Sequence, residues 1–172
     1  IQMKSGLKRR DLLHQRIDQL LPAAHRNGGD VVDRLTRVQL GRLAADLFGE
    51  RLGAMRTVGL SWGTTLEAFV AEVPHRVVPF IKVLPLTGGN PGLDTASAGG
   101  TLVQALARRC GVSAGRLIAP AVVESPHTKA VLTSESGIKA ALEVAATVDH
   151  AFVGIGTIGV RSSVTIVEDM RL

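Results

Sequence analysis

The segment from Thr57 to Phe69 constrains the fold of this chain more than any other stretch. An apolar run over 57–60 enters a turn bounded by Gly59 and Gly63, and an amphipathic run follows at once. Glycine removes side chains where a backbone bends sharply or another group comes close. The segment therefore predicts a strand, a tight turn and a helix in immediate succession, the building block of α/β folds.

The start of this helix predicts an anion site. Thr64 and Thr65 are natural capping residues, and Glu67 follows Thr64 by three positions, as in a capping box. The first N–H groups of a helix have no partner within the helix, and the helix dipole attracts negative charge to them. We expect a pocket for a phosphate or a similarly acidic small molecule.

The rest of the chain alternates between helical and extended patterns. Helices are predicted over 7–21, 32–51, 65–72, 101–109 and 137–147, with another beginning at Ser125-Pro126, where a capping residue precedes proline. Strands are predicted over 57–60, 77–86, 116–123 and 150–155. This alternation favours an α/β fold of the Rossmann-like type, an open, mostly parallel sheet with helices on both faces. Ligands bind such sheets beyond the carboxyl ends of the strands, where glycine-bearing turns fall at 59–63, 88–92 and 154–159.

Composition limits the class of protein. The chain has 172 residues, 45% of them hydrophobic, which is enough for a domain with a sizeable core. No apolar run reaches the roughly 18 residues that cross a bilayer, and the first residues do not resemble a signal peptide, so we expect a cytoplasmic protein without membrane contact. Cys110 is the only cysteine, which excludes an intrachain disulfide, and we interpret it as a small apolar residue at a helix end. The histidines show no metal-ligand spacing, and no metal or cofactor is predicted.

The net charge of +5 lies entirely in residues 1–60, with Lys8-Arg9-Arg10 as the densest cluster. Such a cluster can contact nucleic acid, but a solvated helix face is the favoured interpretation. With no tyrosine and one tryptophan, a stacking platform for single-stranded nucleic acid is not expected.

Two motifs allow other interpretations. Gly59-Leu60-Ser61-Trp62-Gly63 matches the nucleophile elbow of serine hydrolases, which would need Asp94 or Asp149 and His127 or His150 as partners of Ser61. No His-Gly-Gly oxyanion segment is present, and neighbouring positions 149 and 150 in a strand would face opposite sides. The glycines at 154, 156 and 159 match a dinucleotide fingerprint, but a strand pattern follows instead of a helix.

Five segments together resemble one family. They are 40–47, 58–66, 83–89, 119–126 (Ala-Pro-Ala-Val-Val-Glu-Ser-Pro) and 145–156, which ends in Val-Gly-Ile-Gly. In this order, over about 38–158, they resemble the effector-binding domain of SorC/DeoR-type sugar-binding transcriptional regulators.

The resemblance implies a fold like that of sugar-phosphate isomerases, with no catalysis of its own. It implies a phosphorylated sugar as effector, homo-oligomers, and operator DNA bound only through a separate helix-turn-helix domain absent from this chain. Residues 1–37 would be a helical segment or linker, and 38–172 an effector-binding domain that appears truncated at its C-terminus. The residues implied for the phosphate are Ser61, Trp62, Gly63, Thr64, Thr65, Gly88 and Gly89. Further candidates for sugar hydroxyls or charge are Lys82, Asp94 and Gln104.

Three alternatives stay open. Lys82, inside an apolar run, could be a Schiff-base lysine, although a pocket rim or sheet edge is favoured. A sugar-phosphate isomerase or deaminase would need a carboxylate–histidine pair, and none is evident in the pattern. The chain could also be an oligomerisation module that has lost its ligand.

Overall fold

A three-stranded parallel sheet organises the part of the chain that the computed structural model describes, residues 29–78, 81–89 and 98–154. The strands are β1 (Thr57–Leu60), β2 (Lys82–Pro85) and β3 (His150–Phe152), in the spatial order β2-β1-β3. Thr57 is level with Lys82, and Val58 is level with His150. All three strands therefore begin at one edge of the sheet, here called the amino edge, and end at the other, the carboxyl edge.

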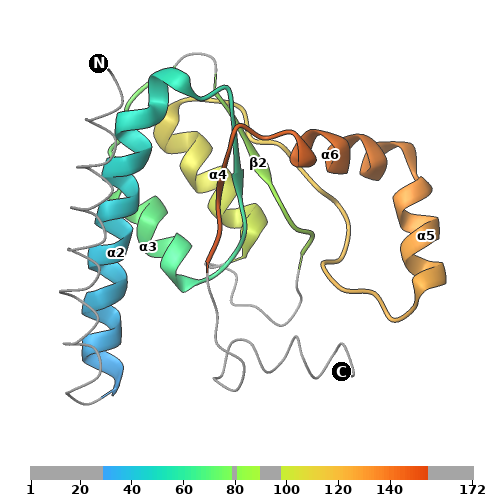
Figure 1. Ribbon diagram of the computed structural model, residues 1–172, viewed down its shortest axis with the longest axis horizontal. Coiled ribbons are helices and arrows are strands. Elements are labelled where there is room, and N and C mark those ends of the chain that lie inside the picture. Colours follow the sequence, from blue (N-terminus) through green and yellow to red (C-terminus); the bar gives the residue numbers. More distant parts are fainter. Residues whose placement is uncertain (1–28, 79–80, 90–97, 155–172) are drawn as a thin grey trace, which may run out of the picture.

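Helices surround this sheet on both sides (Figure 1). Helices α2 (Gly29–Arg51), α3 (Thr64–Glu72) and α4 (Gly99–Cys110) lie on one side, and a short 3-10 helix, η1 (Leu52–Ala54), joins α2 to β1. Helices α5 (Pro126–Ser134) and α6 (Ser136–Ala146) extend on the other. The predicted open, parallel α/β architecture is confirmed.

The core lies between the sheet and the first group of helices. Val58, Leu60 and Val83 point from the strands into this core and are buried, as alternation along a strand requires. Phe48 of α2 meets Phe69 of α3 edge to face, with ring centroids 5.8 Å apart. Phe152 of β3 stacks on Phe69 at 4.7 Å, so three elements share one aromatic cluster.

The strands are shorter than the sequence predicted. Among its described residues, the expected strand over 77–86 pairs only as Lys82–Pro85, because β1 offers just four residues to pair with. Ahead of it, the N–H of Val78 donates to the carbonyl of Cys110 at the end of α4. β3 ends at Phe152, and residue 155 of that predicted strand lies outside the described residues.

The strand expected over 116–123 is wrong. Within 116–123 the structure forms a single isolated bridge, between Pro120 and Gly89, and Gly89 lies beyond the end of β2. The N–H of Gly89 donates to the carbonyl of Ala119, the N–H of Ala121 donates to the carbonyl of Gly89, and the pairing extends no further. The predicted helices over 32–51, 65–72, 101–109 and 137–147 are confirmed within a few residues, and α4 begins two residues early at Gly99. The helix predicted over 7–21 lies outside the described residues.

Helix α5 begins as its sequence indicates. The Ser125 hydroxyl accepts a hydrogen bond from the N–H of Thr128 at 3.1 Å, and Pro126 occupies the first helical position. None of the described helices is long and apolar enough to span a bilayer.

Candidate functional site

The strongest candidate site is the bend between β1 and α3 at the carboxyl edge. Gly63 is the N-cap of α3, with φ 126° and ψ 159°, a region that side chains other than glycine avoid. No side chain caps the helix. The capping box expected from Thr64 and Glu67 is therefore wrong: Thr64 is already helical, and the N–H of Glu67 donates to the carbonyl of Gly63 at 3.0 Å.

The uncapped start of α3 is open. A Cβ atom added to Gly63 would meet no atom within 4 Å. The N–H groups of Thr64, Thr65 and Leu66 have no acceptor one turn earlier in the helix, so they suit an anion, which the helix dipole also favours. Of the hydroxyl residues beside them, Thr64 is exposed, and Ser61 and Thr65 are half-buried.

Neighbouring segments hold Ser61 and Trp62 in place. The N–H of Ser61 donates to the carbonyl of Phe152 at 3.1 Å, which ties the ends of β1 and β3 together. An added Cβ at Gly99, the first residue of α4, would lie 3.4 Å from the Ser61 carbonyl oxygen. One at Gly154 would lie 3.6 Å from the Trp62 carbonyl oxygen. Both distances are ordinary van der Waals contacts, so the start of α4 and the chain after β3 lie directly beside the bend.

The Gly88–Gly89 turn comes to the same edge. The N–H of Leu86 donates to the carbonyl of Leu60 at 2.8 Å, so the chain leaves β2 beside the end of β1. The two glycines differ in role. An added Cβ at Gly88 would collide with the carbonyl oxygen of Ala119, whereas one at Gly89 would meet nothing within 4 Å.

Sequence reasoning missed Thr87. Its hydroxyl oxygen is buried and has no hydrogen-bond partner among the described residues. A buried hydroxyl without a partner is costly, and a ligand oxygen at this edge could satisfy it. The signal was present in the sequence, because a threonine directly follows an apolar strand and precedes two glycines.

One of the other predicted residues, Lys82, lies away from this group. Lys82 is exposed at the first position of β2, level with Thr57, and so lies at the amino edge. The interpretation of Lys82 as a sheet-edge lysine fits this position, but its contact with a ligand beside Ser61 does not. Gln104 lies on the exposed side of α4, and Asp94 lies outside the described residues.

The serine hydrolase geometry is not assembled from Ser61, Asp149 and His150. Ser61 follows the carboxyl end of β1, whereas Asp149 and His150 lie at the amino end of β3. The Asp149 carboxylate accepts hydrogen bonds from the N–H groups of Arg56 and Thr57, each at 2.8 Å, and from the Thr57 hydroxyl. The bonds from Thr57 and Arg56 lower the pKa of Asp149. Its role is to join β3 to β1.

The remaining hydrolase candidate, His127, is exposed on α5. Helix α5 packs mainly against α6, its neighbour in the chain. Among the described residues, no cluster of His, Cys, Asp and Glu could hold a metal ion.

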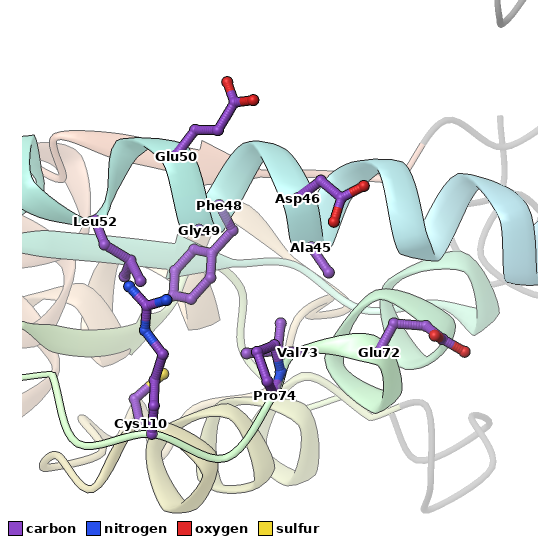
Figure 2. Close-up of a pocket in the computed structure, with 11 residues that line it drawn as sticks. Ala45, Asp46, Phe48, Gly49, Glu50, Leu52, Glu72, Val73, Pro74 and Cys110 are labelled. Carbon is purple, nitrogen blue, oxygen red and sulfur yellow. The ribbon is translucent and has the colours of Figure 1, made fainter.

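Two described cavities lie away from this bend. The larger, about 350 Å³, opens between α2 and the chain that follows α3 (Figure 2). Phe48, Leu52, Val73 and Pro74 line it, and Cys110 lies at its inner end. Burial raises the pKa of the Cys110 thiol, and the charge of Arg76 lowers it to a smaller extent, so the thiol is a poor nucleophile. The second cavity, about 220 Å³, lies between β2, α6 and residues 115–117.

Comparison with known proteins relates the chain to a family of sugar-binding domains. Residues 28–170 match the family model described as "Putative sugar-binding domain". A DeoR family transcriptional regulator from Listeria monocytogenes superposes with a TM-score of 0.70 at 26% identity, over 82% of this chain and 55% of that one. No match was found among proteins of curated function.

Two more distant solved structures share the fold. The full-length sorbitol operon regulator SorC from Klebsiella pneumoniae gives a TM-score of 0.72 at 22% identity, over 80% of this chain and 45% of that one. A transcriptional regulator from Streptococcus pneumoniae TIGR4 gives a TM-score of 0.69 at 20% identity, over 77% of this chain and 51% of that one. The chain spans about half the length of these regulators.

Proposed function

The chain belongs to the sugar-binding domain family, and on this premise we propose that it binds a phosphorylated sugar and thereby controls a DNA-binding domain of the same regulator. The single observation that carries the proposal is the uncapped, open start of α3 directly after β1. The N–H groups of Gly63, Thr64 and Thr65 hold the phosphate, because they have no acceptor within α3 and lie at the positive end of the helix.

Hydroxyl groups around this start complete the phosphate contacts. Ser61 lies beside it at the end of β1, and Thr64 and Thr65 belong to its first turn. Charged phosphate oxygens form stronger hydrogen bonds than neutral acceptors, so each hydroxyl adds to affinity.

The sugar lies between the start of α3 and the turn after β2. Gly89 leaves room there, and the Thr87 hydroxyl supplies a donor that has no partner among the described residues. Gln104 and Asp94 remain further candidates for sugar hydroxyls. Lys82 is left out of the proposed contacts because of its place at the amino edge.

The proposed mechanism involves binding and no reaction. The effector would favour one arrangement of a homo-oligomer over another, and this preference would reach the DNA-binding domain as a coupling free energy. Neither the sugar-phosphate isomerase nor the serine hydrolase alternative is favoured by an observation at this bend, where Ser61 has neither Asp149 nor His150 as a neighbour.

Isothermal titration calorimetry tests the proposal. A panel of sugar phosphates is compared with the matching unphosphorylated sugars. We expect at least one phosphorylated sugar to bind more than tenfold more tightly than its parent, since one charge-assisted hydrogen bond is worth about 1.5–3 kcal/mol. Ser61→Ala should weaken that ligand by about tenfold or more.

The matched control is Ser134→Ala. Its hydroxyl donates to the carbonyl of Val131 inside α5, far along the chain from the proposed site. This variant should bind as the parent chain does. Equal affinity for sugars with and without phosphate would show that the α3 start is not an anion site.

A further inference from the structure

Positive charge gathers at the amino edge, opposite the proposed sugar site. This edge is where β1 and β2 begin and where α2 and α4 end (Figure 1). Its exposed cations are Arg51, Arg56, Arg76, Lys82 and Arg108. Four of these five are arginines, the residue best suited to bind phosphate through two hydrogen bonds at once.

Backbone hydrogen bonds bring these residues together from separate segments. The N–H of Lys82 donates to the carbonyl of Arg56 at 2.8 Å, so the starts of β2 and β1 are adjacent. The N–H of Arg76 donates to the carbonyl of Arg109 at 2.8 Å, so the chain after α3 runs beside the end of α4. The guanidinium group of Arg109 is partly buried and donates a hydrogen bond to the carbonyl of Val73, so Arg109 is not counted among the exposed cations.

Carboxylates do not neutralise this edge. Within the described part of the chain, the five exposed cations form no ion pair. Glu72, at the end of α3, pairs with Arg42 at 3.0 Å. Asp149 directs its carboxylate to the N–H groups of Arg56 and Thr57. Glu50, on the last turn of α2, and Asp46, one turn earlier, line the same cavity as Arg76.

The rest of the described surface is close to balanced in charge. Its cations are Arg34, Arg37, Arg116, Lys129 and Lys139. Its carboxylates are Glu67, Glu124, Glu135 and Glu143. Most of the excess positive charge of the described side chains therefore lies at the amino edge.

Helix dipoles explain only part of this arrangement. Arg51 and Arg108 stand in the last turns of α2 and α4, where a cation stabilises the helix. Arg76 lies in a connection beside the end of α4, where its charge also acts on Cys110. Arg56 and Lys82 stand at strand starts, so these two have no helix end to stabilise. Repulsion among exposed cations is a cost that a polyanionic partner removes.

We propose that the amino edge is a contact surface for the sugar-phosphate backbone of duplex DNA. Arginine and lysine on one edge, contributed by several segments, fit a row of phosphates and carry no base specificity. The proposal relies on the proposed function only for the presence of DNA near this domain. It assigns DNA contact to a surface distinct from any DNA-binding domain and from the proposed sugar site.

Fluorescence anisotropy with a labelled 20-base-pair duplex of arbitrary sequence tests this surface. Affinity of the 172-residue chain is measured between 50 and 200 mM NaCl. Each phosphate neutralised contributes about 0.9 to the slope of log K against log salt. The double substitution Arg56→Gln/Lys82→Gln should make that slope less negative by about 1.8 and weaken binding more than tenfold at 100 mM salt.

Two control variants make the outcome decisive. Lys129→Gln/Lys139→Gln removes the same charge from α5 and α6 and should leave the slope unchanged. When Lys8, Arg9 and Arg10 are also replaced by glutamine, the two double variants should still differ in DNA affinity and in salt slope.

Three results would overturn the proposal. The first is an equal loss of DNA affinity in both double variants, and the second is that the two variants no longer differ once Lys8-Arg9-Arg10 is neutralised. The third is tighter binding to poly-L-glutamate than to the duplex. The last would identify an acidic protein as the partner. Because Arg56 and Lys82 lie outside the proposed sugar site, phosphosugar titration of the same variant separates failure of this surface from failure of that site.

Discussion

Gly41 provides the sharpest test of how the helix bearing the candidate site is held. It is buried in α2 where that helix packs against α3. An added Cβ would lie 2.6 Å from the Ala68 carbonyl carbon, 2.7 Å from its oxygen and 2.9 Å from the Phe69 nitrogen. These are backbone atoms, so no side-chain rotation can relieve the overlap.

The expected effect of Gly41→Ala is the difference between two terms. Ordinary contact begins near 3.4 Å, so the two helices must separate by roughly 0.8 Å at this point. Overpacking of this kind costs about 1–3 kcal/mol, and a clash between two backbones belongs at the upper end. Alanine recovers about 1 kcal/mol of helix propensity. We expect a net destabilisation of about 2 kcal/mol.

Gly49 is the matched control, because it lies in the same helix and an added Cβ there would meet nothing within 4 Å. Gly49→Ala should therefore stabilise the chain, by up to about 1 kcal/mol. In thermal unfolding followed by circular dichroism, Gly41→Ala should lower Tm by about 4–8 °C, and Gly49→Ala should raise it by about 2–4 °C. Shifts of the same sign in both variants would refute the close approach of α2 and α3.

Further substitutions test the bend, the strand junction and a cap. Gly63→Ala should cost about 1–3 kcal/mol in urea unfolding through its φ of 126° alone, because no atom obstructs the new methyl group; an unchanged midpoint would contradict that backbone conformation. The pKa of Asp149 is lowered in the folded state, so its contribution to stability is complete above the unfolded pKa of about 3.8 and is lost as the pH falls through the folded pKa. Asp149→Asn should therefore flatten the curve of unfolding free energy against pH in this acidic range. Parallel curves for the variant and the parent chain would show that Asp149 does not join β3 to β1 as a charged group. Ser125→Ala should destabilise α5 by about 1 kcal/mol, because the cap of this helix is lost. Since α5 has no buried residue, we expect faster amide hydrogen exchange within α5 alone and no shift in global unfolding.

Local patterns predicted the elements around the candidate site well. The bounds of β1 matched the apolar run over 57–60, and α3 began within one residue of its predicted start. The Ser125-Pro126 signal for α5 was also confirmed. These succeeded because a strand–turn–helix succession and a helix cap depend on residues only a few positions apart.

Predictions that needed distant partners were less successful. The apolar runs over 77–86 and 116–123 have strand composition, but β2 pairs with β1 over four residues, and 116–123 forms one isolated bridge at Pro120. The N-cap of α3 is Gly63 and not Thr64 or Thr65, the threonines predicted as caps. In the sequence, Lys82 could equally belong to a pocket rim or a sheet edge, and only the pairing of β2 with β1 places it at the amino edge.

By itself, the sequence determined the alternation of strands and helices, the glycine bend after β1 and the absence of a disulfide, because periodicity, turn chemistry and cysteine count are local or compositional properties. Only the tertiary structure decided which ends of these elements meet. Thr57 and Asp149 are 92 residues apart, yet one carboxylate joins them, and this contact helps set which residues lie at each edge of the sheet. Register arises from pairing between distant segments, so the separation of the edge proposed to bind a sugar phosphate from the cationic edge emerges only when the chain has folded.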